Sequence, residues 1–171
     1  VASVTVLPNP ATAYVGGFYA RALPVTTRDA ANNVLTGRSI AWTSLNQPIA
    51  TVDPVTGVIT GVAAGTATIR ATSEGVSGDA TVNVTLVPIS TVVVTPATAT
   101  LNVASAPTQA FAASPRDSAN NVISGAALGG RTTSWSVAPA TVASITPSGV
   151  VTALAQGSAT VTATVGGTNG T

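Results

Sequence analysis

The sequence predicts an all-β protein built from two β-sandwiches in tandem, and three observations lead to this prediction. Val, Ile and Thr are abundant among the 171 residues, and such β-branched side chains favour a pleated sheet. Apolar and polar residues alternate over short stretches such as 67–71, which is typical of half-buried strands. Gly, Pro and Asn-Asn interrupt the pattern at the spacing of a sandwich, and the whole pattern occurs twice.

The two halves of the chain align in order over almost their full length. The matched segments are "VTVLPNPATAYV" (4–15) with "VVVTPATATLNV" (92–103), "TTRDAANNVLTG" (26–37) with "SPRDSANNVISG" (114–125), "SIAWTS" (39–44) with "TTSWSV" (132–137), and "IATVDPVTGVITGVAAGTATIRAT" (49–72) with "VASITPSGVVTALAQGSATVTAT" (142–164). Each copy has the size of a small domain. We therefore predict domain 1 over residues 1–86 and domain 2 over residues 87–171, joined by a short segment without Gly.

Each copy is expected to contain the same elements in the same order. An opening strand over 4–6 leads towards the loop "RDAANN" (28–33), because Asp and Asn are typical of a hairpin turn. A strand with a single tryptophan follows, Trp42 in one copy and Trp135 in the other, and each supplies a core anchor. The first copy closes with the last strand "DATVNVTL" (79–86), whose apolar residues fall on one face.

These residues resemble the bacterial Ig-like domain, group 2. The family pattern reads Gly-hydrophobic-hydrophobic-Thr, then Ala-x-x-Gly-Thr-Ala-Thr-Ile. It is matched by "GVIT" (57–60) with "GTATI" (65–69), and again by "GVVT" (149–152) with "GSATV" (157–161). The resemblance implies two tandem immunoglobulin-like sandwiches. It further implies a spacer or structural unit, as in bacterial surface proteins, adhesin stalks and phage virion proteins, and it supplies no catalytic residues.

The second copy is expected to lack its last strand, because the chain reaches Thr171 directly after "VGGTNG" (165–170), which is expected to form the preceding turn. A sandwich without that strand has an unpaired edge and an open apolar groove. Two explanations stay open. One is a piece excised from a longer protein, in agreement with the lack of an initiating Met and of a signal peptide. The other is a strand donated head to tail by another copy, which would build a filament. The segment "VASVTV" (1–6) is a candidate donor, although its own domain needs it.

Composition excludes several classes of function. Charged residues make up 6% of the chain, against roughly 25% in ordinary soluble domains, and the scattered Arg residues form no basic patch for nucleic acid. No apolar run is long enough to cross a membrane. The chain has no His and no Cys, which removes the usual general base, the Ser-His-Asp triad and thiolate or imidazole metal sites. We expect no enzyme activity, no catalytic or metal residues and no cofactor.

Two loops and one aromatic group were the candidates for binding sites. The loop residues are Asp29, Asn32 and Asn33 in the first copy and Asp117, Asn120 and Asn121 in the second. One carboxylate in each loop is poor for Ca²⁺, so a turn that fixes strand register is favoured. A paired-carboxylate site would need Asp29 near Asp53, or Glu74 near Asp79, and nothing in the spacing indicates either.

Tyr14, Phe18 and Tyr19 offer a platform for sugar stacking, and the simpler alternative is packing at the core and edge of domain 1. Asn83 and Asn169 begin the N-glycosylation sequons "NVT" and "NGT". Asn83 lies in a predicted strand, which disfavours modification there.

The predicted function is that of an extracellular or cell-surface structural protein, a stalk or filament subunit that polymerises by strand complementation. Its expected partners are further copies of itself, bound head to tail, or neighbouring Ig-like domains. The alternative is an adhesin fragment that binds a glycan or a receptor through its loops. A third interpretation is a phage virion decoration protein. Exposed aromatic residues in the loops would favour the adhesin, and ordered polymerisation would favour the filament.

Overall fold

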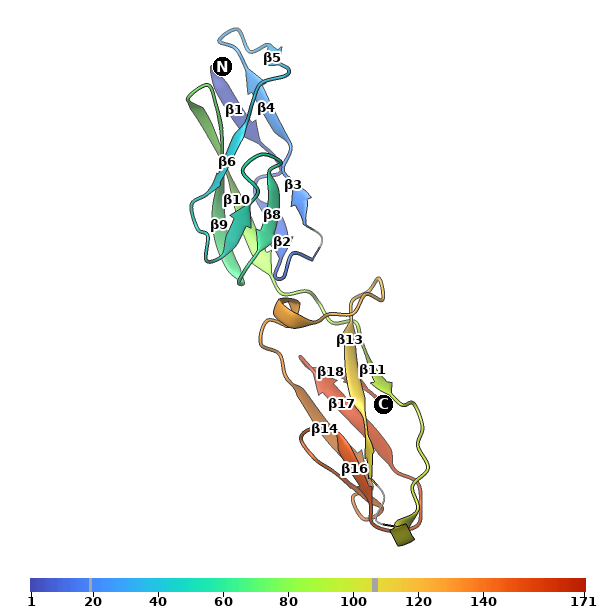
Figure 1. The fold of residues 1–171 in the computed structure, drawn as a ribbon. Coiled ribbons are helices and arrows are strands. Elements are labelled where there is room, and N and C mark those ends of the chain that lie inside the picture. The colour runs from blue at the N-terminus through green and yellow to red at the C-terminus, as the bar shows by residue number, and fades with distance from the viewer. Residues whose placement is uncertain (19, 106–107) are drawn as a thin grey trace. The chain divides into compact units, whose positions relative to one another are not determined.

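The computed structural model describes residues 1–18, 20–105 and 108–171, and within them strands dominate (Figure 1). Helical structure in these residues consists of the 3₁₀ turns η1 (Val103–Ser105) and η2 (Gly125–Leu128). None of these residues belongs to a helix long and apolar enough to cross a membrane. The all-β prediction is therefore confirmed.

The chain divides into two compact units. Unit 1 comprises Val1–Val87 with Gly125–Gly129, and unit 2 comprises Pro88–Ser124 with Gly130–Thr171. The strands of unit 1 are β1 (Ser3–Val6), β2 (Ala11–Tyr14), β3 (Arg21–Ala22), β4 (Val25–Arg28), β5 (Val34–Leu35), β6 (Ala41–Ser44), β7 (Ala50–Val52), β8 (Val58–Gly61), β9 (Gly65–Ser73) and β10 (Val76–Thr85).

The sheets of unit 1 have the strand orders β1-β4-β5, β2-β10-β9-β6 and β3-β8-β7. The N-terminal segment takes part in two of them, because β1 pairs antiparallel with β4 while β2 pairs parallel with β10. Val4 and Val6 on β1 are buried. The segment considered as a strand donor is thus already paired and packed within its own unit.

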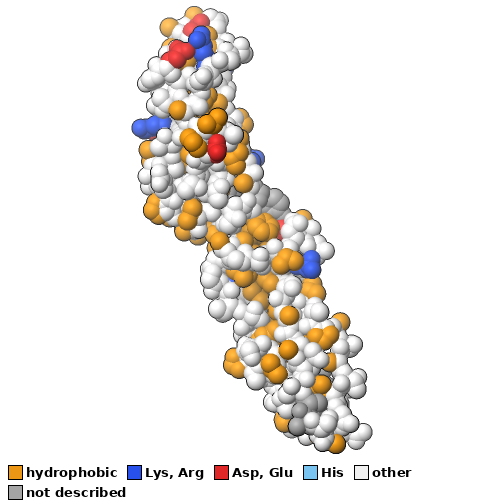
Figure 2. Space-filling view, viewed as in Figure 1, with side chains coloured by type: hydrophobic (Ala, Val, Ile, Leu, Met, Phe, Trp, Pro, Cys, Tyr) orange, Lys and Arg blue, Asp and Glu red, His pale blue; other side chains and the backbone are white. Residues whose placement is uncertain are grey.

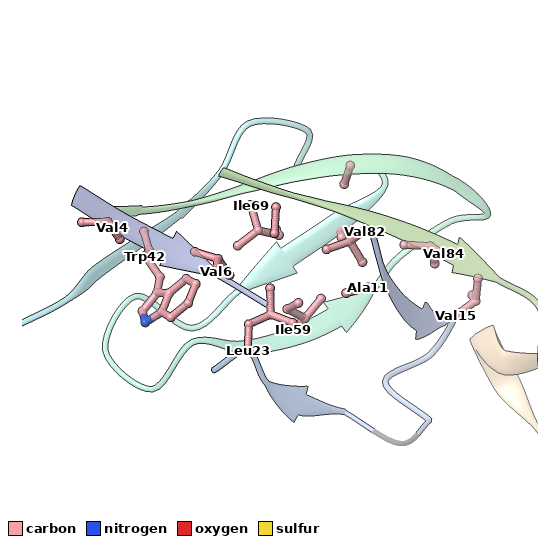
Figure 3. Close-up of a cluster of buried hydrophobic side chains, with 14 residues drawn as sticks. Val4, Val6, Ala11, Val15, Leu23, Trp42, Ile59, Ile69, Val82 and Val84 are labelled. Carbon is pink, nitrogen blue, oxygen red and sulfur yellow. The ribbon is translucent and has the colours of Figure 1, made fainter. Parts of the chain in front are cut away.

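The core of unit 1 is a continuous cluster of small and β-branched side chains from facing strands (Figure 3). β10 pairs with β9 through most of its length, and Ala80, Val82 and Val84 on β10 have exposed fractions of 0%, 0% and 3%. The last strand therefore fills the centre of this sandwich. Alternate residues of β9 are buried against it, as the period of two in the sequence predicts.

Unit 2 has shorter strands. They are β11 (Thr91–Thr95), β12 (Thr108–Ala110), β13 (Ala112–Arg116), β14 (Thr133–Ala138), β15 (Ala143–Ile145), β16 (Val150–Ala153), β17 (Thr160–Val165) and β18 (Thr168–Gly170). Their sheets have the orders β11-β13, β12-β16-β15 and β14-β17-β18.

β18, the last strand of unit 2 within residues 1–171, is much shorter than β10 of unit 1. β18 has 3 residues, whereas β10 has 10. The sequence assigned the whole of 165–170 to a turn, but the structure already pairs Thr168 with Val165 and Gly170 with Ala163. The turn is tighter than expected because Gly166 and Gly167 both adopt positive φ, 57° and 86°, which glycine tolerates at no steric cost.

Both units place a glycine under the ring of the predicted core tryptophan. Gly57 and Gly149 have φ of 70° and 82°. A Cβ on Gly57 would lie 2.6 Å from Trp42 Cε2, and one on Gly149 would lie 2.8 Å from Trp135 Cε2. Trp42 is buried while Trp135 is half-buried, so the anchor is less enclosed in unit 2.

Candidate functional site

The Asp-x-x-Asn-Asn loops form closed hydrogen-bond networks. In unit 1, the amides of Ala31 and Asn33 both donate to Asp29 Oδ1 at 2.9 Å, and Asn33 Nδ2 donates to Asp29 Oδ2 at 3.0 Å. Arg28 Nη1 donates to the Asn32 carbonyl at 2.8 Å, and Asn32 has φ 68°. The hydrogen bonds from Asn33 hold the pKa of Asp29 below its ordinary value. The carboxylate thus organises the turn.

The second copy repeats this network almost bond for bond. The amides of Ala119 and Asn121 donate to Asp117 Oδ1 at 2.9 and 2.8 Å, and Asn121 Nδ2 donates to Oδ2 at 3.0 Å. Arg116 Nη1 donates to the Asn120 carbonyl at 2.9 Å. The predicted turn is confirmed in both copies. In each copy the Asp and Asn side chains stabilise the turn through hydrogen bonds within the loop.

The other carboxylates also take part in local structure. Asp53 Oδ1 accepts hydrogen bonds from the backbone amide and the hydroxyl of Thr56 at 2.7 and 2.8 Å. The hydrogen bond from the Thr56 amide is the main reason that the pKa of Asp53 lies below its ordinary value. Asp79 forms a two-pronged ion pair with Arg70, at 2.8 Å on each oxygen. The described residues contain no group of three or more His, Cys, Asp or Glu side chains able to hold a metal.

Charge is sparse on the surface as well. Figure 2 shows scattered charged side chains on the visible face and no large patch of one sign. The formal net charge of the whole chain is +1.

The aromatic group of domain 1 lines only a minute cavity. Tyr14 and Phe18 surround about 10 Å³ together with Leu23 and Ile59, and Tyr19 lies outside the described residues. Tyr14 and Phe18 are half-buried. The cavity has room for about one water molecule, so the described part of this group is packed against the sandwich rather than spread as a platform.

The two sequon asparagines lie in strands. Asn83 on β10 is opposite Thr66, whose hydroxyl donates to Asn83 Oδ1 at 3.3 Å. Asn169 on β18 is opposite Thr164, whose hydroxyl donates to Asn169 Oδ1 at 2.8 Å. Both asparagines are exposed. The side chains therefore join neighbouring strands on the solvent face.

Unit 2 contains a large groove. Its volume is about 1050 Å³, and it runs between the segment 96–104, the start of β17 and the ends of β15 and β16. Phe111, Val137 and Val151 line it from the sandwich interior, and Thr171 stands at its end. None of the described residues that line the groove has a charged side chain. The sequence predicted an open apolar groove at this edge. The structure contains an open groove, but polar uncharged residues such as Asn102, Gln156 and Ser158 line it together with the apolar ones.

The groove occupies the position that β10 fills in unit 1. In unit 1, residues 82–85 of β10 pair with β2 on one side, and residues 82–84 pair with the start of β9 on the other. In unit 2, the segment matching β2 is 99–102, which forms no strand, and β18 stops before reaching it. In unit 1, β10 lies between β2 and the start of β9. In unit 2, no strand of residues 1–171 lies between the matching segments, which are 99–102 and the start of β17.

Residues at corresponding positions of the two units differ in their exposed fraction beside the groove. Ala67 on β9 is 1% exposed, whereas its counterpart Ala159 is exposed. Val15 is 3% exposed and its counterpart Val103 is 44% exposed. By contrast, Ala163, which faces Gly170 of β18, is fully buried. The exposed positions on this side of β17 therefore lie outside the residues that pair with β18.

Comparison with known proteins gives a family match and a fold match. Residues 1–84 match the model of the bacterial Ig-like domain (group 2). No curated protein sequence matches the chain significantly. Among solved structures the chain is similar to invasin, a bacterial integrin-binding protein, with 20% identity and a TM-score of 0.57 over 97% of this chain and 36% of that chain.

Two further structures show weaker likeness. Domains 4 and 5 of the S-layer protein SbsC share 22% identity with a TM-score of 0.42, over 86% of this chain and 77% of that chain. A C-terminal fragment of intimin, in complex with its receptor's intimin-binding domain, shares 16% identity with a TM-score of 0.37, over 98% and 62%. The predicted class, an all-β chain of immunoglobulin-like sandwiches, is confirmed by the family match, the invasin likeness and the strands themselves.

Proposed function

We propose, from the premise that residues 1–84 belong to the bacterial Ig-like domain family (group 2), that this chain is a structural spacer of an extracellular or cell-surface protein. In this proposal domain 1 spans residues 1–86, and domain 2, residues 87–171, is a second domain of the same kind. The chain adds length and stiffness between other parts of a surface protein, a stalk or a filament.

One observation carries the proposal: the two units share the same loop network and the same glycine–tryptophan contact. The Asp29 and Asp117 networks agree in six of their donor–acceptor pairs, and Gly57 and Gly149 each lie against the ring of the tryptophan of their unit. A spacer needs copies of one stable unit, since length grows with copy number. A binding protein needs at least one distinct surface, and the described aromatic residues are buried or half-buried.

The proposal assigns no catalytic role, and the chemistry of the chain supports this. General acid–base and nucleophilic catalysis rely most often on His, Cys or grouped carboxylates. The sequence has no His or Cys, and the carboxylates of Asp29, Asp53 and Asp79 already accept hydrogen bonds from their own turn or from Arg70.

The test changes the number of units in the protein that carries this chain. Residues 1–86 are deleted in one variant and duplicated in another, and immunogold labelling measures the distance between a terminal tag and the cell envelope. A spacer predicts that this distance shortens and lengthens with the number of units while binding to host or glycan surfaces is unchanged. Loss of surface binding with an unchanged distance would contradict the spacer and indicate an adhesin.

A further inference from the structure

We propose that the five residues by which the second copy exceeds the first, 126–130, are a structural part of unit 1. They form a cap on the end of unit 1 at Gly16 and Leu86, and unit 1 needs this cap for its full stability. Domain 1 as the repeat defines it, residues 1–86, is therefore not complete by itself. This inference goes beyond the spacer role and does not depend on it.

The inserted residues are identified by aligning the two copies. Gly37 matches Gly125, whereas the residue directly after Gly37, Arg38, matches Arg131. Removing residues 126–130, "AALGG", would leave "SGRTTSW" in the second copy, against "TGRSIAW" in the first. Surface loops tolerate insertions, so a loop without contacts of its own is the simplest expectation for these residues.

The insertion is folded and belongs to unit 1. Residues 125–129 group with Val1–Val87 rather than with the residues on either side of them in the sequence. The turn η2 is closed by Gly129, whose amide donates to the Ala126 carbonyl at 2.9 Å. Ala127 in the middle of the turn is 2% exposed, whereas Ala126 and Gly129 are exposed. A loop without contacts would expose its central side chain as well.

A backbone contact joins η2 to the Val15 end of the unit 1 core (Figure 3). Gly16 has φ 81°, and a Cβ on Gly16 would lie 2.8 Å from the Ala127 amide nitrogen and 3.2 Å from Ala127 Cβ. Gly129, with φ 58°, lies against the side chain of Leu86, which itself packs against the core of unit 1. The contact therefore leaves no room for a side chain at position 16.

The glycine that receives the cap is also specific to one copy. Gly16 corresponds to Ala104 in the second copy, and Ala104 is exposed and lies in η1. Ala104 carries the Cβ that Gly16 must lack. The first copy thus supplies the receiving glycine and the second copy supplies the cap, as expected for two features that serve one contact.

The cap changes how the chain passes through the two units. The chain enters unit 2 at Pro88, returns to unit 1 for residues 125–129 and enters unit 2 again at Gly130. Unit 1 can therefore complete its fold only once residue 129 is available, and its complete unfolding must withdraw η2.

The first test deletes residues 126–130 from the 171-residue chain. Trp135→Phe leaves Trp42 as the sole tryptophan, so thermal unfolding followed by fluorescence reports on unit 1. We expect the deletion to lower the midpoint of unit 1 by at least about 5 °C. An unchanged midpoint would overturn the proposal, because the insertion would then contribute nothing to unit 1.

Two point substitutions provide a matched control that keeps the length of the chain. Ala127→Leu enlarges the buried side chain of η2, and Ala126→Leu enlarges an exposed side chain of the same turn. Ala127→Leu should displace the cap and lower the midpoint of unit 1 as far as the deletion does. Ala126→Leu should change this midpoint by no more than about 2 °C. Equal shifts for the two variants would contradict the packing assigned to Ala127.

A third test measures the coupling between the cap and Gly16. Gly16→Ala strains a left-handed backbone in every background, but its clash with Ala127 exists only when the insertion is present. The loss in the full chain should therefore exceed the loss in the deletion variant by about the shift that the deletion itself causes. Equal losses in the two backgrounds would overturn the contact. None of these outcomes bears on the spacer role, which the distance measurement tests by itself.

Discussion

Replacing matched alanines with asparagine tests how far the two sandwiches differ. Ala67 is 1% exposed and faces Val82 of the last strand, whereas Ala159 holds the same place in unit 2 and is exposed. Asparagine at position 67 would bury an amide without partners, at about 1–3 kcal/mol. It would also overfill a packed core, at about 1–3 kcal/mol more.

The expected loss for Ala67→Asn is therefore about 2–6 kcal/mol, a large part of the about 5–15 kcal/mol that stabilises an ordinary domain. Ala159→Asn should change the stability of unit 2 by no more than about 0.5 kcal/mol, as for an exposed site. The assay is urea unfolding, followed at Trp42 in a Trp135→Phe background and at Trp135 in a Trp42→Phe background. Equal losses at the two positions would refute the reasoning, because Ala159 would then be enclosed.

Three further outcomes follow from the described contacts. Gly57→Ala should destabilise unit 1 by about 2–5 kcal/mol, from a left-handed backbone and a clash with Trp42, as urea unfolding would show; a loss below 1 kcal/mol would contradict the contact. Asp117→Ala should cost about 1–3 kcal/mol by leaving two loop amides unpaired, measured in the same assay with Asp117→Asn as the intermediate control. The hydrogen bonds with Arg70 lower the pKa of Asp79 below its ordinary value of 3.8. The ion pair therefore contributes its full stabilisation of the folded state above pH 3.8, and this stabilisation is lost as the pH falls through the pKa of Asp79 in the folded state. Acid titration of Asp79→Asn should therefore show a stability deficit at neutral pH that disappears in strong acid, and a constant deficit would contradict it.

The features that could be predicted from the sequence depend on short-range chemistry. The Asp-x-x-Asn-Asn loops close through residues two to four positions apart, so their composition alone indicates the turn. Alternation predicts the buried face of β9 for the same reason. The tryptophans were also recognisable as anchors, although Trp135 is only half-buried.

The features that could not be predicted depend on long-range pairing. Nothing local indicates that β1 and β2 separate into different sheets, or that β2 pairs in parallel with β10. The requirement for glycine at position 61 is likewise not apparent from the sequence, because it depends on the distances from Gly61 to Val84 and to the Tyr14 carbonyl. Aromatic residues near one another in sequence suggested a platform, while the structure packs Tyr14 and Phe18 around a water-sized cavity.

Hydrogen exchange of the unaltered chain tests the central claim most directly, because it compares the two copies within one molecule. The amides of residues 66–69 on β9 lie beside the full-length β10, and those of residues 158–161 lie beside the groove. We expect strong protection at 66–67, which pair with β10, and at 163–165, which pair with β14 and β18. Exchange at 158–159, which lie outside the strands, should be at least about a hundredfold faster than at 66–67. Equal protection at 66–67 and 158–159 would contradict the difference in strand pairing between the two units.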